Sequence, residues 1–274
     1  MIIDSHIHFW NFDPLRDAWI TEDMNIIRKD FLPDDVKPLF DKNGISGCIA
    51  VQADQSDDET KFLLQLAQEN YFIKGVIGWV DLKNPEIDKT LSGYQENKKL
   101  KGFRHISEGE LPGFLTQPDI IRGITSLHKY GYTYDILIKQ HQLKEAISLT
   151  KTLPDQQFIL DHCGKPNLKN DDITLWKQQL KIIAQNPNVY CKLSGLLTQC
   201  NWNDWNEKEI YDCLDTVFEN FGTNRVLFGS DWPVMLLAGS YSKWLRLVSK
   251  YTDRFTGEEI ENIFYKNAEL FYKL

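Results

Sequence analysis

Two histidines stand two positions apart near the start of the chain, in the run MIIDSHIHFW (residues 1–10). Because side chains alternate across a strand, His6 and His8 are expected to share one face at the carboxyl end of a first strand. Two imidazoles that converge on one point suit a metal ion or the polarisation of a carbonyl group. Taken alone, the pair is more often two core or surface histidines, so its interpretation depends on partners elsewhere in the chain.

Two such partners follow short apolar runs far downstream. His162 lies in LDHCGKP (residues 160–166), and Asp231 lies in GSDWP (residues 229–233). Each has an ordinary structural alternative, since His162 could cap a neighbouring helix and Asp231 could be the N-cap before Pro233. If all four residues stand at strand ends of one sheet, three imidazoles and a carboxylate converge, and we interpret that combination as a reaction centre.

The elements that would position these residues alternate along the whole chain. Eight strands are predicted, at residues 2–5, 47–52, 75–80, 101–105, 133–138, 157–161, 189–193 and 226–230, with amphipathic helical stretches between them. Their spacing predicts an α/β fold, a single-domain (β/α)8 TIM barrel over residues 1–274. The main competitor, a doubly wound open sheet, would be expected to carry a Gly-rich turn where His6 and His8 stand.

In a barrel of this kind the chemistry lies at the carboxyl ends of the strands, which supply further candidates. Arg104 lies at the carboxyl end of the fourth strand and has a fixed fork of donors for substrate oxygens. Its alternative role is a structural ion pair with Asp135. A regular strand aims only one of Arg104 and His105 inward, and we favour Arg104. The connection after the first strand, residues 9–31, is long enough to be functional and carries Trp10 and Trp19.

The composition narrows the class of protein. The chain has 274 residues and a formal net charge of −8, which argues against nucleic acid as a partner. No apolar run approaches the length of a membrane span. Five irregularly spaced cysteines without a C-x-x-C pair, and no recognisable signal peptide, predict a cytoplasmic protein with reduced thiols.

The chain resembles the amidohydrolase superfamily, and within it the sugar-lactone hydrolase group that includes the L-fuconolactone and L-rhamnonolactone hydrolases. The resemblance runs from the first strand to the last. Its motifs are HIHFW (residues 6–10), KDFLP (29–33), GFRH (102–105), LDHCGKP (160–166), KLSG (192–195) and GSDWP (229–233).

The resemblance implies a hydrolase that opens a sugar-derived lactone, a small-molecule substrate, by attack of water on the carbonyl group. Asp231 would be the general base, and His6, His8 and His162 would polarise the carbonyl or hold a metal that does. A lactone is an activated ester, so the site needs mainly to stabilise the developing oxyanion.

The resemblance does not decide whether the site binds a metal ion. One zinc ion held by His6, His8 and Asp231, with or without His162, satisfies ligand chemistry. The predicted fifth strand has no histidine or lysine to bridge two ions, so a two-metal centre is not expected. Members of the same group also resemble enzymes that work without metal, so a metal-independent site is the other possibility.

Substrate contacts are expected from side chains near the mouth of the barrel. Arg104 and Lys165 would donate to sugar oxygens, and Trp10 and Trp232 would stack on the ring. Trp202 and Trp205 lie on loops of the same face. Asp4 is expected to orient one of the two first-strand histidines, and Cys163 to pack away from the site.

Two other functions remain open at this point. A metal-dependent decarboxylase of the same superfamily is one, although such enzymes normally keep a strand-five histidine ligand that this chain lacks. A non-catalytic binding protein on a barrel scaffold is the other, and in it Asp231 would be a structural cap.

Overall fold

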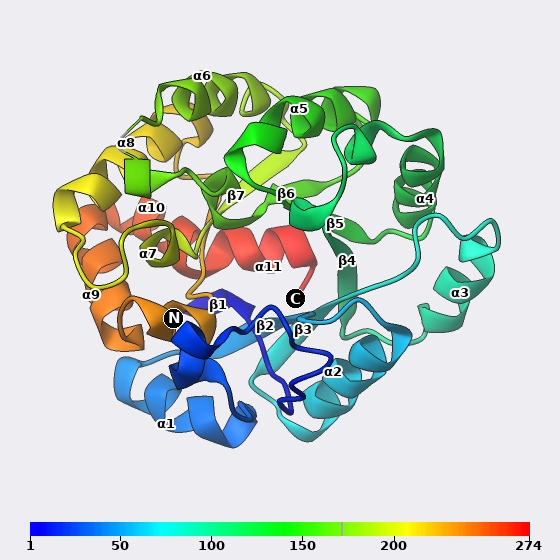
Figure 1. Cartoon of the computed structure of the whole chain (residues 1–274), viewed down its shortest axis with the longest axis horizontal. Coiled ribbons are helices and arrows are strands. Elements are labelled where there is room, and N and C mark those ends of the chain that lie inside the picture. Colours follow the sequence, from blue (N-terminus) through cyan, green and yellow to red (C-terminus); the bar gives the residue numbers. More distant parts are fainter. Residues whose placement is uncertain (171) are drawn as a thin grey trace.

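Eight parallel strands are hydrogen-bonded in chain order in the computed structural model, which describes residues 1–170 and 172–274. The strands are β1 (Ile3–Ile7), β2 (Gly47–Val51), β3 (Ile73–Gly78), β4 (Leu100–Ile106), β5 (Thr133–Leu137), β6 (Phe158–Leu160), β7 (Val189–Leu193) and β8 (Val226–Phe228). Figure 1 shows the helices arranged around the ring of strands. The predicted (β/α)8 barrel is confirmed, and the doubly wound open sheet is excluded.

Residues just beyond the short strand β8 close the ring. The amide of His8 donates to the carbonyl oxygen of Trp232 at 2.8 Å, and the amide of Asp231 donates to that of His6 at 2.9 Å. These two bonds place the ends of the first and last strands side by side. Residues 225 positions apart in the sequence therefore become neighbours at the mouth of the barrel.

The outer layer follows the predicted helical stretches closely. Its longer helices are α1 (Pro33–Asn43), α2 (Asp57–Glu69), α3 (Ile87–Tyr94), α4 (Pro118–Lys129), α5 (Leu143–Thr152), α6 (Thr174–Ile183), α8 (Glu207–Phe221) and α9 (Tyr241–Thr252), with the short α7 (Leu196–Gln199) after β7. The predicted cap Ser56 accepts a hydrogen bond from the amide of Glu59 at 3.1 Å.

The helix predicted from residue 257 to 271 is interrupted. It consists of α10 (Gly257–Glu261), a π-helical turn η8 (Asn262–Lys266) and α11 (Asn267–Tyr272). The predicted helix keeps its extent, and the sequence did not indicate the π turn because a single widened turn leaves the periodicity almost unchanged. Beyond the turn, the side chain of Asn267 donates to the carbonyl oxygens of Thr223 and Val226, which holds the segment against the base of β8.

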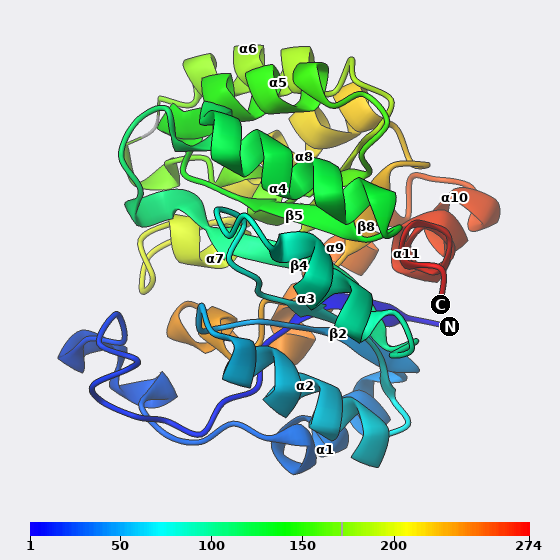
Figure 2. The same ribbon diagram turned by 90° about the vertical axis from the view of Figure 1, so that its right-hand side faces the viewer.

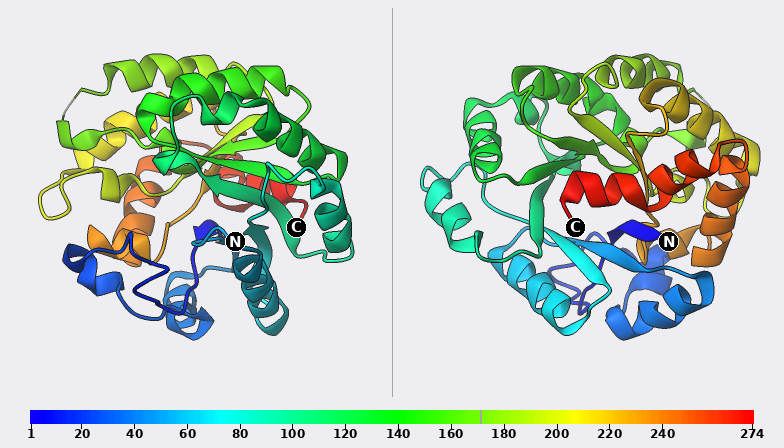
Figure 3. Two further views of the ribbon diagram at one scale, coloured as in Figure 1. Left: turned by 45° about the vertical axis from the view of Figure 1, so that its right-hand side comes forward. Right: turned by 180° about the vertical axis from the view of Figure 1, so that it is seen from behind.

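Helix α11 closes the barrel at the end near both chain termini (Figure 3, right). Its residues Phe271 and Tyr272 belong to a buried cluster with the inward-facing apolar residues of the strands. Those strand residues are Ile3, Ile49, Val51, Ile77, Ile159 and Leu227. The lower half of the barrel interior is therefore an apolar core, and the polar residues collect at the opposite end.

The long connection between β1 and α1 projects from the end of the barrel opposite the termini (Figure 2). Its two ends are held together by a pair of backbone hydrogen bonds between Trp10 and Phe31, each of 2.9 Å. The indole of Trp19 packs edge-on against Trp10, with ring centroids 6.1 Å apart. In the described part of the chain no helix is both long and apolar enough to cross a membrane.

Candidate active site

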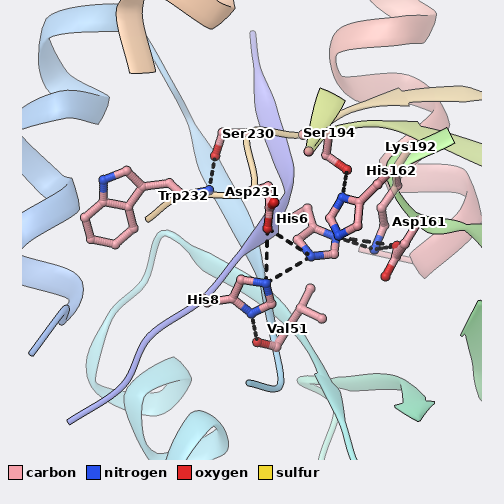
Figure 4. Close-up of polar contacts among 12 residues, drawn as sticks. His6, His8, Val51, Asp161, His162, Lys192, Ser194, Ser230, Asp231 and Trp232 are labelled. Carbon is pink, nitrogen blue, oxygen red and sulfur yellow. Dashed lines mark hydrogen bonds and ion pairs between the residues drawn. The ribbon is translucent and has the colours of Figure 1, made fainter. Parts of the chain in front are cut away.

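The structure brings His6, His8 and Asp231 together at the mouth of the barrel (Figure 4). The Nε2 atoms of the two imidazoles lie 3.2 Å apart. The Oδ1 atom of Asp231 lies 3.3 Å from Nε2 of His8 and 3.8 Å from Nε2 of His6. All three residues are buried, so their interactions are only weakly screened by water.

The backbone around Asp231 directs its side chain into the barrel. Asp231 has a positive φ of 62°, a left-handed conformation that aspartate tolerates better than most residues. Asp4 supports this turn, since its carboxylate accepts hydrogen bonds from the amide of Ser230 and the hydroxyl of Tyr241, each at 2.8 Å. Asp4 also accepts from the backbone amide of His6. Its contact is thus with the backbone of a histidine and not with either imidazole, where we had expected it.

The backbone fixes the tautomer of His8. Its Nδ1 atom lies 2.8 Å from the carbonyl oxygen of Val51, at the end of β2. A carbonyl oxygen only accepts, so Nδ1 carries the hydrogen and Nε2 presents a lone pair. Burial lowers the pKa of His8, which favours this neutral form. The lone pair faces His6 and Asp231.

His6 lies deeper and is surrounded by charged groups. Its Nδ1 atom is 3.4 Å from both Asp161 Oδ1 and Lys192 Nζ, and its Nε2 atom is 3.2 Å from Arg104 Nη1. Burial holds the pKa of His6 well below its usual range, so the ring is neutral near pH 7. Lys192 Nζ is already engaged by Asp135 and Asp161. The acceptor Asp161 at Nδ1 and the donor Arg104 at Nε2 therefore fit a ring with its hydrogen on Nδ1.

Four charged side chains form a cluster beneath His6. Lys192 Nζ lies 2.5 Å from Asp135 Oδ2 and 3.0 Å from Asp161 Oδ1. Arg104 Nη1 lies 3.0 Å from Asp161 Oδ2. All four residues are at most 3% exposed, and the two cations balance the two anions. Such a cluster is tolerated in an interior only because it is neutral as a whole and internally paired.

The partner of Arg104 is Asp161 and not Asp135, which we had named as its alternative. Asp135 forms an ion pair with Lys192, and it also accepts a hydrogen bond from the hydroxyl of Tyr272 at 3.2 Å. Burial raises the pKa of Asp135 to about 6. Although burial acts to raise the pKa of Asp161 as well, Lys192, His6 and Arg104 hold it well below its usual range.

Sequence reasoning assigned no role to Lys192 or Asp161. A signal was present, because Lys192 stands inside an apolar β-type run in which an unpaired charge is very costly. Arg104 does point inward, as expected. His105 turns away and pairs with Glu110 at 2.9 Å.

His162 reaches the site on an unusual turn after β6. His162, Cys163, Gly164 and Lys165 all have positive φ angles, between 48° and 72°. The ring of His162 lies 4.5 Å from that of His6, and its Nδ1 atom is 2.9 Å from the hydroxyl of Ser194. Burial holds the pKa of His162 well below its usual range. Gly195 is required beside it, because a Cβ atom there would stand 2.5 Å from the imidazole.

These residues border a pocket of about 250 Å³. Its polar lining consists of His8, Arg104, Glu108, His162, Lys165 and Asp231. Its apolar lining consists of Trp10, Trp19, Ala53, Ile106, Leu137 and Val234. Its volume and its mixture of apolar walls with a few convergent polar groups suit a small organic ligand.

Some of the expected side chains lie elsewhere. Trp232 is only 2% exposed and packs edge-on against Phe9 and Phe31, so it supports the mouth of the barrel from behind. The indole nitrogens of Trp202 and Trp205 donate to the backbone at Thr198 and Ala238, outside the pocket lining. Cys163 donates toward the carbonyl oxygen of Lys192 and is fully buried, consistent with a packing role.

The donor atoms fit one divalent cation better than two. His6, His8 and Asp231 offer two imidazole lone pairs and a carboxylate oxygen within 4.8 Å of one another, a set that zinc accepts. A second group, His6, Asp161 and His162, shares His6 with the first. Its carboxylate is already paired with Lys192 and Arg104, so it has little capacity left for a metal.

Known proteins resemble this chain over nearly its full length. The family model described as Amidohydrolase matches residues 3–274. A protein of Burkholderia multivorans named L-fucono-1,5-lactonase is 37% identical over 92% of this chain and 88% of its own length. A second protein of that name, from Burkholderia ambifaria, is 30% identical over 99% of this chain and 95% of its own. The crystal structure of an amidohydrolase from Burkholderia multivorans with bound zinc superposes with a TM-score of 0.97 at 35% identity, covering 100% of this chain and 99% of the other.

Proposed function

This chain is a hydrolase of the amidohydrolase family, and we propose that it opens a sugar-derived 1,5-lactone such as L-fucono-1,5-lactone. The observation that carries the proposal is the pocket itself, into which Asp231, His8, His162 and Arg104 converge. The 37% identity to a protein named L-fucono-1,5-lactonase supports the choice of substrate class. The substrate is a small molecule, and we assign the enzyme to the cytoplasm on the pattern of its cysteines.

Asp231 acts as the general base in this proposal. Water attacks the lactone carbonyl carbon, and its proton passes to the Asp231 carboxylate as the new carbon–oxygen bond forms. The ring carbon–oxygen bond then breaks, and the departing alkoxide takes the proton held by Asp231, which gives the open hydroxy acid and regenerates the carboxylate. Asp231 is suited to this role because it lines the pocket and is otherwise buried, with only 4% of the residue exposed.

The developing oxyanion requires donors or a cation close to the carbonyl oxygen. Arg104 and His162 border the pocket next to Asp231, and Arg104 is permanently charged. His6 and His8 complete the catalytic group and, with Asp231, would hold a single zinc ion. When bound, zinc would supply Lewis-acid polarisation of the carbonyl group.

The sugar ring would be held by the walls of the pocket. Trp10 is positioned for stacking because its indole nitrogen is already satisfied by the carbonyl oxygen of Lys29 at 2.8 Å, which fixes the plane of its ring. Lys165 would donate to a ring hydroxyl. Trp232 is assigned a supporting role, since Phe9 and Phe31 cover its ring.

A panel of aldonolactones tests the proposal. The purified protein is incubated with 1,5- and 1,4-lactones of L-fucose, L-rhamnose and their stereoisomers, and release of acid is followed with and without a chelator. We expect turnover of at least one deoxysugar 1,5-lactone well above spontaneous hydrolysis. If no lactone of the panel is opened faster than the blank, in the presence or absence of added zinc, the proposed function is wrong.

A further inference from the structure

We propose that Glu108 and Lys165 form one recognition unit that binds two adjacent hydroxyl groups of the substrate ring, and this inference rests on the proposed lactonase function. Glu108 follows β4 in the short turn η2 (Ser107–Gly109), and Lys165 follows β6. Their charged groups form an ion pair across the end of β5. Both side chains line the pocket and are 20% exposed, so the pair is accessible from inside the pocket.

The two loops that carry the pair are anchored by one segment. In η4 (Gln140–Gln142), the side chain of Gln140 accepts from the amide of Asn167 at 2.8 Å. The side chain of Gln142 donates to the carbonyl oxygen of Ser107 at 2.7 Å and is 3% exposed. Ser107, which directly precedes Glu108, and Asn167, two residues beyond Lys165, are thereby bound to the same short turn. The position of the pair therefore depends on one buried and one partly buried polar contact and not on two free surface loops.

The turn that carries Lys165 also carries His162, and its backbone conformation sets the direction of both side chains. Three non-glycine residues in this turn, His162, Cys163 and Lys165, adopt positive φ angles. Residues other than glycine adopt this left-handed conformation only at a cost in free energy. The left-handed course sends both His162 and Lys165 into the pocket. A surface lysine would not require this backbone, so the conformation is consistent with a role for Lys165 inside the site.

The pair retains hydrogen-bonding capacity. Over residues 1–170 and 172–274, neither charged group has another side-chain hydrogen bond or ion pair besides their mutual contact. An ammonium group has three donors, and a carboxylate accepts several hydrogen bonds. An ammonium and a carboxylate in contact match adjacent hydroxyl groups, because Lys165 can donate to one hydroxyl oxygen while Glu108 accepts from the next O–H. Such charge-assisted bonds are the strong ones.

The proposal is tested by pairing protein variants with substrate analogues. Glu108→Gln and Lys165→Met are assayed on L-fucono-1,5-lactone and on its analogues that lack one ring hydroxyl each. We expect each variant to lower kcat/KM on the full substrate by about tenfold to a hundredfold, mainly through KM. For each variant, one analogue should lack the hydroxyl that the altered side chain binds, and on that analogue the variant should lower kcat/KM hardly at all. The two hydroxyls identified in this way should be on adjacent ring carbons.

Matched controls separate recognition from loop stability. Glu110→Gln removes a carboxylate two positions away that pairs with His105 outside the pocket lining, and it should leave all rates unchanged. If the Glu108–Lys165 pair only ties two loops together, both variants will lose the same factor on every analogue and melt at a lower temperature. That result, or no loss on the full substrate, overturns the inference. Failure of the unaltered enzyme on all lactones would instead reject the proposed function.

Discussion

The Nε2 atom of His8 lies 3.3 Å from the carboxylate of Asp231, while its Nδ1 atom is held by the carbonyl oxygen of Val51. The imidazole hydrogen is therefore on the side away from Asp231. The carboxylate faces a lone pair and not a donor, so its basic oxygen is not occupied by a hydrogen bond from His8. This arrangement leaves Asp231 free to accept a proton from water or to share a cation with His8.

The first prediction concerns Asp231→Asn. Asparagine has nearly the same shape and tolerates the left-handed backbone at this position, but its amide cannot accept the proton. We expect kcat on the best lactone to fall at least about a hundredfold, the lower range for general acid–base catalysis. Initial rates, corrected for spontaneous hydrolysis, give the measurement.

The thermal melt distinguishes this role from a purely structural one. The variant should melt close to the unaltered protein, and Asp253→Asn, at the end of α9, should leave the rate unchanged. Near-normal turnover by folded Asp231→Asn protein would show that another group is the base. Ligand affinity without any turnover in the unaltered protein would instead favour a non-catalytic binding protein.

The barrel and its mouth could be predicted from the sequence because they depend on local patterns. Alternating apolar runs identified all eight strands, and the two-residue period placed His6 and His8 on one face. The convergence of His162 and Asp231 on that face then followed from the rule that barrel strands present their carboxyl ends at one mouth.

The charged cluster could not be predicted in the same way, because its contacts cross the barrel interior. Arg104 on β4 reaches Asp161 after β6, whereas the sequence offered Asp135 on the adjacent strand β5 only as an alternative ion-pair partner. Asp135 instead forms an ion pair with Lys192 on β7. Which of several inward-facing charges pair depends on depth and side-chain length, and neither is contained in strand order.

The second prediction concerns Lys192→Met. Removing this cation leaves Asp135 and Asp161 buried without their shared partner, which for a broken buried ion pair costs about 3–5 kcal/mol. The free energy of unfolding in urea measures this loss. The double variant Lys192→Met with Asp135→Asn should recover part of it, since one uncompensated charge is then removed.

An exposed lysine provides the matched control. Lys208 pairs with Asp212 one helical turn away and is 83% exposed, so Lys208→Met should have little effect. If Lys192→Met is as stable as the control, the cluster does not contribute to the fold in the way its geometry indicates.

The third prediction concerns metal stoichiometry. The donor set of His6, His8 and Asp231 accommodates a single ion, so elemental analysis of protein dialysed against zinc should find at most one equivalent per chain. His8→Ala should reduce zinc retention, because it removes one of the two converging lone pairs. Two equivalents per chain would contradict this prediction.

The last prediction concerns Glu59 on α2, which is buried and accepts a hydrogen bond from the amide of Ala53 at 2.9 Å. Burial raises the pKa of Glu59 from 4.5 to about 7. Between these values the folded chain keeps a proton that the unfolded chain releases, so Glu59 lowers stability as the pH rises from about 4.5 to about 7. The full penalty, up to roughly 3 kcal/mol, applies above that window.

Glu59→Gln keeps the acceptor oxygen for Ala53 and removes the charge. We therefore expect the variant to gain stability over the unaltered protein in urea at pH 8, and to gain little or nothing at pH 4.5. Asp58→Asn, which alters the neighbouring carboxylate on the exposed side of the same helix turn, should not change the pH dependence. An equal difference between Glu59→Gln and the unaltered protein at both pH values would mean that the Glu59 carboxylate titrates normally, and the assigned effect of its burial would be wrong.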